Sequence, residues 1–283
     1  MQNLGSGGEI GHYMSYKMRP SGILEHLHAS ALYIGIGLLA SVIIYFIRDW
    51  KPALLLIILN FLALFVSGGR IALALTLIAL FVMIVAVYKK SQLKEKIRNL
   101  VALFILSILI LLVWCVSLSL YYPSVKDYLV NNYVLLITQG KYDTGPNMNI
   151  VKLFFIEVER FISNFCHYPW AFPFGVGMTS LINSHYFSCE DFYVLQIMGQ
   201  YGLIGAMIFY SLCFISMWQW GKCLSRLNGD DYYITLFAGI VLSMLLLTML
   251  HSPVLLRKSI YPLFFFSLGI IQFYHDAISL KER

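Results

Sequence analysis

The sequence predicts an all-α, polytopic membrane protein, and three observations support this prediction. Of the 283 residues, 59% are hydrophobic and only 12% are charged, whereas soluble domains are about 45–50% apolar and about 25% charged. Two runs, 29–47 and 100–120, contain no charge, and each has the length of about 20 residues that crosses a hydrocarbon core of roughly 30 Å. The net charge is +6, but the basic residues do not form a tract with interleaved aromatic residues, so we expect no nucleic-acid partner. In a membrane protein, an excess of lysine and arginine mostly determines the orientation of the spans.

Seven apolar runs, all in the printed sequence, are predicted to span the membrane: 29–47, 53–67, 71–88, 100–120, 199–217, 234–250 and 259–274. The second run is short, so it either ends early or continues past the following glycine pair as a broken helix. One long polar stretch separates the fourth run from the fifth, and no internal repeat of the kind found in many transporters is evident. The chain therefore divides into four parts: a segment 1–28, four spans in 29–120, a large loop 121–198, and three spans with a tail in 199–283.

Charge predicts the orientation of these spans. The segment 89–98 carries five basic residues against one acidic residue, which is typical of a cytoplasmic loop. Alternation then places the loop 121–198, with six acidic residues against four basic ones, on the outer face together with 1–28. Because an outer segment that starts the chain has no span before it, we expect that preceding helices are missing.

Arg70 lies in the sequence SGGR between the second and third spans, where the alternation predicts an outer-face turn. An arginine on this face departs from the positive-inside rule, which makes it a candidate functional residue. The alternative is that its side chain extends along the apolar surface to bind lipid phosphate.

Four segments with chemically useful side chains are predicted on the same outer face. They are YKMRPSGILEH, SGGR, ERFISNFCHYPWAFPFGVG and INSHYFSCEDFYVLQIMGQYGLIGAMIFY, the last of which runs into the fifth span. They carry Arg19, Arg70, Arg160, Gly175, Gly177, His185, Glu190 and Asp191. In the third segment we expect an apolar stripe on a helix, formed by Ile156, Phe161 and Phe165. Prolines then end the helix, and the two glycines allow a tight turn and a close approach of the backbone to a ligand.

Converging arginines suit a phosphate or pyrophosphate, because guanidinium groups bind phosphate oxygens with two parallel hydrogen bonds and keep their charge. They also stabilise the charge that develops on a leaving phosphate, while His185 or a carboxylate takes a proton from an attacking hydroxyl. Since the chain has no Walker loop, HExxH or DxD pattern, we expect no nucleotide, metal or other cofactor. The alternatives are that Arg19 and Arg160 only pair with nearby Glu25 and Glu157, that His185 is merely solvated, and that Glu190 and Asp191 cap the fifth span.

The order of these motifs resembles the bacterial O-antigen polymerases and the related O-antigen ligases. The resemblance runs from about residue 16 to 270, and it is carried by RPSG before a span, SGGR between spans, and PWAFPFGVG followed by SHYFSCEDFYVLQIMGQYGLIG. Members generally have ten or more spans. The histidine at His185 matches the ligases, but Tyr186 stands where they have asparagine, and SCED is more similar to the polymerases.

The resemblance implies a metal-independent glycosyltransferase with a GT-C-like, all-helical fold in the bacterial inner membrane. It would transfer undecaprenyl-pyrophosphate-linked oligosaccharide at the periplasmic face, with membrane lipids, a chain-length regulator and a flippase as partners. The catalytic residues would be Arg70, Arg160, His185 and Asp191. The substrate-binding residues would be Arg19, Arg70, Arg160, Gly175, Gly177 and Glu190.

Three other functions stay open at this point: an O-antigen ligase, a transporter or flippase for the same lipid-linked sugar, and a non-catalytic remnant. A transporter requires charged or unwound sites near the membrane midplane, whereas the polar residues here concentrate in one outer loop. A disulfide between Cys166 and Cys189, both in that loop, is also an open alternative.

Overall fold

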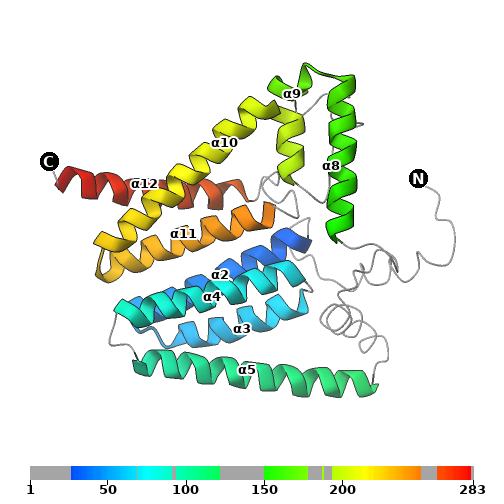
Figure 1. Cartoon of the computed structure of the whole chain (residues 1–283). Helices are drawn as coiled ribbons and strands as arrows, with labels where there is room; N and C mark the ends of the chain where they lie inside the picture. Colours follow the sequence, from blue (N-terminus) through cyan, green and yellow to red (C-terminus); the bar gives the residue numbers. More distant parts are fainter. Residues whose placement is uncertain are drawn as a thin grey trace. The chain divides into compact units, whose positions relative to one another are not determined.

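The computed structural model describes residues 27–67, 69–90, 94–121, 150–177, 187, 193–249 and 260–281. Within them every regular element is a helix (Figure 1). The elements are α2 (Leu27–Arg48), α3 (Pro52–Val66), α4 (Arg70–Lys90), α5 (Lys94–Tyr121), α8 (Ile150–His167), α9 (Ala171–Phe174), α10 (Tyr193–Arg226), α11 (Gly229–Met249) and α12 (Tyr261–Lys281).

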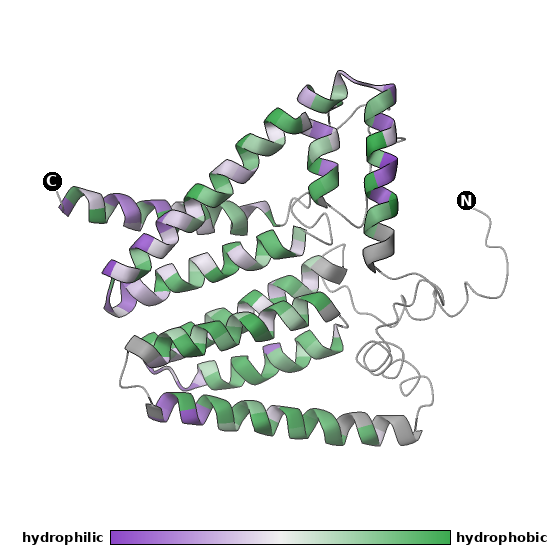
Figure 2. Ribbon diagram, viewed as in Figure 1, coloured by the Kyte–Doolittle hydropathy of each residue, from purple (hydrophilic) through white to green (hydrophobic). Residues whose placement is uncertain are grey.

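Six of these helices are long and apolar enough to cross a membrane, namely α2, α4, α5, α10, α11 and α12. The helix α3 is apolar but has only 15 residues. Figure 2 shows that α3 and α4 are hydrophobic over most of their length, whereas polar residues recur along α8. The prediction of an all-α, multi-pass membrane protein is therefore confirmed.

The seven predicted spans correspond one to one with α2, α3, α4, α5, α10, α11 and α12. The short second span ends at Val66, so it does not continue through the glycine pair. The fifth differs most: 199–217 was predicted, but α10 has 34 residues and is interrupted at Gly202, whose φ of 67° and ψ of −175° are not helical. A straight helix of that length would be about 51 Å long, which exceeds the roughly 30 Å hydrocarbon core.

The chain folds into two compact units, Met1–Asp143 and Thr144–Arg283. This division falls inside the predicted outer loop 121–198, so α8 and α9 belong to the same packing unit as the last three spans. Topology and packing therefore divide the chain at different places.

In the first unit, α2 packs against α3 and α4 and is the most buried span. Small residues make this approach possible: a Cβ at Gly35 would fall against the Thr76 side chain, and one at Gly37 would touch Asn60. Thr76 donates a hydrogen bond to Ala72 O over 2.6 Å, so its hydroxyl is satisfied within its own helix. Close packing at glycine and hydrogen-bonded hydroxyls is the usual way in which helices associate in a membrane.

In the second unit, α10 packs against both α11 and α12, and α11 is its most buried span. The Trp220 ring lies where a Cβ at Gly239 would be, and its Nε1 donates to Thr235 O over 3.0 Å. An indole that lies over glycine and bonds to a backbone carbonyl fixes α10 against α11.

In each unit, a polar contact joins two helix ends that the predicted alternation of spans places on the same face of the membrane. In the first unit, Lys96 at the start of α5 lies 3.2 Å from Asp49, just after α2. In the second unit, the Tyr274 hydroxyl near the end of α12 donates to Asp231 Oδ1 over 2.9 Å, at the start of α11. Both contacts agree with the predicted up-and-down order of the spans within each unit.

Candidate functional site

The predicted site residues fall in different parts of the structure. Arg160, Gly175 and Gly177 are described in the second unit, and Arg70 is the first residue of α4 in the first unit, where only its backbone is described. Four of the predicted residues lie outside the described ranges: Arg19, His185, Glu190 and Asp191. The described part of the site is therefore the junction of α8, α9 and α10.

An amphipathic face of α8 packs on this junction. Phe161, with 2% of its surface exposed, belongs to a buried cluster with Ala171, Val176, Phe187 and Leu195. Val158 and Phe165 pack against the same cluster, so residues at i, i+3 and i+7 form the buried face. The predicted stripe is right for Phe161 and Phe165 but wrong for Ile156, which is 42% exposed, because a spacing of five residues does not keep one face of a helix.

Aromatic rings hold α8, α9 and Phe187 together. The ring centroid of Phe187 lies 5.6 Å from that of Phe161 and 4.8 Å from that of Phe165, and Phe165 lies 5.6 Å from Phe172 of α9. Such pairs each contribute about 0.5–1.5 kcal/mol beyond the burial of their area. The described part of the outer loop thus has a core of its own.

The expected helix stop also occurs. The helix α8 ends at His167, and Pro169 lies in the turn that leads to the four-residue α9. In this turn Ala171 N donates to Tyr168 O over 2.9 Å. The proline therefore ends α8, and a single short helix redirects the chain towards α10.

A pair of glycine segments then joins α9 to the interruption in α10; we call residues 175–177 and 199–202 together the glycine clasp. Val176 N donates to Gly199 O, and Gly177 N donates to Gln200 O, both over 2.9 Å. These bonds satisfy carbonyls that the broken helix leaves without an intrahelical partner. The clasp thus stabilises the interruption at Gly202.

Two glycines of the clasp have conformations that only glycine adopts readily. Gly175 has φ 73° and ψ 175°, and Gly202 has φ 67° and ψ −175°, a region that is essentially restricted to glycine. A Cβ on Gly175 would collide with the backbone of Gln200 and Gly202, and one on Gly202 with the backbone of Pro173 and Phe174. The turn predicted at Gly175 is therefore present, and the close approach there is to another part of the chain.

Gly177 differs from Gly175, because its φ of 79° is also positive but a Cβ there would meet no atom of the described residues within 4 Å. Of the two predicted glycines, Gly177 is the one that the described residues leave open on its Cβ side. A substrate-binding role for either glycine stays a prediction.

Arg160 pairs with an acidic neighbour, as the alternative interpretation proposed. Its Nη2 lies 2.6 Å from Glu157 Oε2, and its guanidinium carbon lies 5.6 Å from the centroid of the Phe161 ring. Oε2 accepts no hydrogen bond from the described residues, so the contact is an ion pair without hydrogen-bond geometry. The Arg160 side chain remains 43% exposed, which leaves part of the guanidinium accessible to an anion.

Two glutamines at the start of α10 were not singled out from the sequence. Gln200 is 3% exposed, and neither its Oε1 nor that of Gln196 has a hydrogen-bond partner within the described structure. An unsatisfied buried polar group costs about 1–3 kcal/mol. The signal was available, since both glutamines interrupt the apolar sequence VLQIMGQYGLIG.

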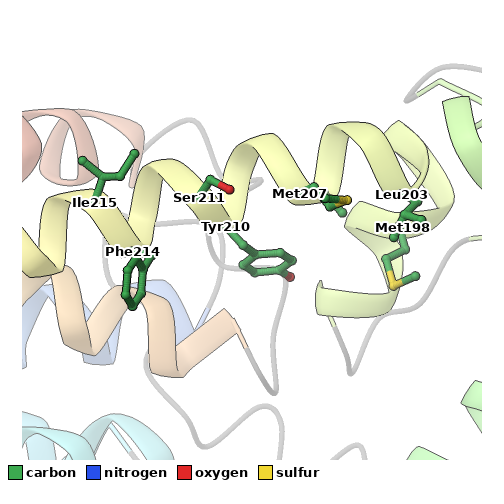
Figure 3. A pocket seen from close by; sticks show the side chains of 8 residues that line it. Met198, Leu203, Met207, Tyr210, Ser211, Phe214 and Ile215 are labelled. Atoms are coloured by element: carbon green, nitrogen blue, oxygen red, sulfur yellow. The ribbon is translucent and has the colours of Figure 1, made fainter.

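A shallow groove of about 580 Å³ follows α10 past its interruption (Figure 3). Met198 lines it from before Gly202, and Leu203, Met207 and Tyr210 line it from after. The Tyr210 hydroxyl is buried and accepts or donates no hydrogen bond among the described residues. Among the described residues, α10 supplies all of the lining.

The SGGR turn of the first unit has a different construction. The Ser67 hydroxyl donates to Leu64 O over 2.6 Å and accepts from Gly69 N over 3.3 Å. Gly69 is buried, and a Cβ on it would collide with the Ala31 side chain of α2. The turn is tight because α3 and α4 both pack on α2.

The position of Arg70 follows from this turn. The helix α4 runs for 21 residues from Arg70 to Lys90, a length of about 31 Å that matches the hydrocarbon thickness. The basic residues therefore lie at the two ends of the span, and Arg70 is placed at one membrane face. The expectation that Arg70 does not lie at the bilayer centre agrees with this geometry.

Cys166 is exposed and carries a free thiol in the structure. Cys189, the partner considered for it, lies outside the described residues. The pairing of Cys166 with Cys189 therefore stays a prediction.

No protein-family model matches this chain, and no curated protein matches it in sequence. The helices themselves define the class of this protein, which is a multi-pass, all-helical membrane protein. A more specific function has to be argued from its residues.

Proposed function

We propose that this protein polymerises undecaprenyl-pyrophosphate-linked repeat units into O-antigen or a related surface polysaccharide at the periplasmic face of the bacterial inner membrane. The observation that carries the proposal is where the charged residues lie. Within the described spans, every charged residue lies in the first or last two turns of its helix. A transporter is expected to have charged or unwound sites near the midplane, whereas an enzyme that acts at the surface needs its charges at the membrane face.

Arg70 adds a second argument. A cation at a helix N-terminus is unfavourable by about 0.3–1 kcal/mol, because it opposes the helix dipole. A bound pyrophosphate would reverse that effect, since helix N-termini and guanidinium groups both attract phosphate oxygens. The placement of Arg70 at the first residue of α4 is therefore easier to explain with an anionic substrate than without one.

In the proposed reaction, a sugar hydroxyl of one lipid-linked unit attacks the anomeric carbon of the lipid-linked chain. The new glycosidic C–O bond forms as the bond from that carbon to the pyrophosphate breaks. His185 or Asp191 takes the proton of the hydroxyl, and Arg19, Arg70 and Arg160 stabilise the lipid pyrophosphate that leaves.

The proposal is tested by complementation. The full chain is expressed in a host that lacks its own surface-polysaccharide polymerase, and lipopolysaccharide is separated on a gel. We expect a ladder of repeats from the unchanged chain and no ladder from Arg70→Ala or Arg70→Lys, because lysine cannot form the guanidinium fork. Arg48→Lys, an arginine at the end of α2, is the matched control and should keep the ladder.

Membrane levels of all variants are compared by immunoblot, so that loss of protein is separated from loss of activity. A ladder retained by Arg70→Lys would contradict a pyrophosphate role for Arg70 and favour lipid snorkelling. No ladder from the unchanged chain, with the protein present in the membrane, would contradict the polymerase. Restored lipopolysaccharide in a ligase-deficient host instead would identify a ligase.

A further inference from the structure

A second groove of about 330 Å³ lies between α10 and α12 in the second unit. Six of the residues that line it are Ile197, Tyr201 and Phe209 of α10 and Tyr261, Phe264 and Phe265 of α12. The rings of Phe209 and Phe264 are stacked, with centroids 6.2 Å apart and planes inclined by 15°. Unlike the groove in Figure 3, this one has a wall on each side.

The polar atoms of this lining are concentrated at one end. The helices α10, α11 and α12 alternate in direction, so α10 and α12 run parallel and their N-terminal ends lie on the same face. Tyr261 is the first residue of α12 and Tyr201 lies just before the interruption in the N-terminal third of α10, while Leu212 lines the groove further along α10. Tyrosine is common where a membrane span meets the interface. The groove therefore has an interfacial end and an apolar end, as an amphiphile would require.

Most of the exposed residues that line this groove are apolar, as contact with lipid chains would require. Ile208 and Leu212 at its rim are exposed, and both walls are helices that are long and apolar enough to cross a membrane. The available partners are thus the molecules of the membrane itself. The volume equals that of roughly eleven water molecules at about 30 Å³ each, which is room for part of one hydrocarbon chain.

The interfacial end of the groove adjoins the glycine clasp. Tyr201 lies between Gln200, whose carbonyl accepts from Gly177 N, and Gly202, which abuts Gly175. A head group at this end would therefore lie beside the described part of the candidate site. A single narrow groove suits a lipid with one chain better than a phospholipid with two.

We propose that the α10/α12 groove holds the first isoprenoid units of the lipid-linked donor, with the pyrophosphate at the tyrosine end beside the glycine clasp. This inference rests on the proposed polymerase function and adds to it the place where the donor lipid enters. No covalent step is involved, because the groove only positions the lipid.

The test is photo-crosslinking of the purified full chain in nanodiscs with an undecaprenyl pyrophosphate that carries a diazirine near its head. We expect label on peptides of α10 and α12, and competition by unlabelled undecaprenyl pyrophosphate but not by phosphatidylethanolamine. Leu212→Trp and Ile208→Trp, which place an indole at the rim, should each reduce this label about tenfold, equivalent to about 1.4 kcal/mol of binding free energy. The matched control is Ile215→Trp, an exposed residue of the same helix that lines the other groove, and it should keep the label.

Label on other helices, or equal competition by phosphatidylethanolamine, would overturn the groove proposal. Unchanged labelling of both Ile208→Trp and Leu212→Trp would also overturn the groove proposal. The two proposals fail separately: competed label on α10 and α12 from a chain that makes no polymer would leave the groove standing without the polymerase. A polymer ladder from both rim variants, with label elsewhere, would leave the polymerase standing without the groove.

Discussion

The SGGR turn and the glycine clasp both use glycine to close a tight junction, but different atoms make glycine necessary. At Gly69 of the SGGR turn, an added Cβ would meet the Ala31 side chain. At Gly175 and Gly202 of the clasp, it would meet backbone atoms, and both residues also have a positive φ. A side chain can be exchanged for a smaller one, whereas a backbone cannot. A second substitution at the neighbouring side chain should therefore restore the SGGR turn after glycine is replaced, whereas no second substitution should restore the glycine clasp.

Gly202→Ala should have the largest effect. The substitution combines a conformation that is essentially restricted to glycine with a collision against the backbone of Pro173 and Phe174. We expect a loss of about 3 kcal/mol or more in the free energy of unfolding, measured as a lower midpoint of thermal unfolding in detergent. Gly177→Ala is the control, since its φ is also positive but an added Cβ meets none of the described residues; it should lose about 1–2 kcal/mol. Equal losses would contradict the clasp.

Gly69→Ala should come next, with a loss of about 1–3 kcal/mol from overpacking against Ala31. The double variant Gly69→Ala with Ala31→Gly removes the obstructing methyl group and should recover part of that loss. The readout is the same unfolding midpoint, compared across the two single variants and the double variant. Strict additivity of the single effects would show that the two residues do not interact, and would contradict the side-chain explanation of this turn.

A third comparison concerns the polar side chains beside the two junctions. Ser67 makes two hydrogen bonds, whereas Gln200 Oε1 makes none with the described residues. Ser67→Ala should therefore cost about 1 kcal/mol, and Gln200→Leu should be neutral or stabilising by a similar amount. If Gln200→Leu is stable but makes no polymer in the complementation assay, Gln200 contributes to activity. A loss of stability comparable to that of Ser67→Ala would show that Oε1 is satisfied in the folded protein.

Arg160→Gln should have the smallest effect on stability. Its ion pair with Glu157 is within one helix turn and nearly half exposed, and such pairs contribute about 0.2–1 kcal/mol. The unfolding midpoint should change little, while the proposed pyrophosphate role predicts a loss of polymer. Glu157→Gln is the control, because it breaks the same pair but keeps the guanidinium. A loss of polymer in both variants would mean that the ion pair itself is required.

The spans could be predicted from the sequence because their signal is local. Charge-free apolar runs identified the seven apolar helices of the described residues, including the short α3, and the prolines at Pro169 and Pro173 indicated the end of α8 and the turn around α9. A tight turn at Gly175 and Gly177 was likewise expected from a short GVG sequence, and both residues have a positive φ in the structure. Each of these features depends on residues that are close together along the chain.

The features that escaped prediction depend on residues far apart in sequence. Gly202 lies in an apolar run that reads as a continuous helix, and only its contact with Gly175, 27 positions earlier, shows why the helix breaks there. The burial of Gln200 depends on the same packing. The error at Ile156 is different, because correct helical periodicity would have selected Val158 as the partner of Phe161 and Phe165.

The shortness of α3 has a consequence for the membrane around the SGGR turn. Its 15 residues extend only about 22 Å, several ångströms less than the hydrocarbon core that surrounds them. A bilayer accommodates such a mismatch by becoming thinner beside the helix. Thinning would draw lipid head groups and water inward next to Ser67 and Gly69, which would leave a local depression of the membrane surface at the start of α4. Charged pyrophosphates could reach that depression without leaving water.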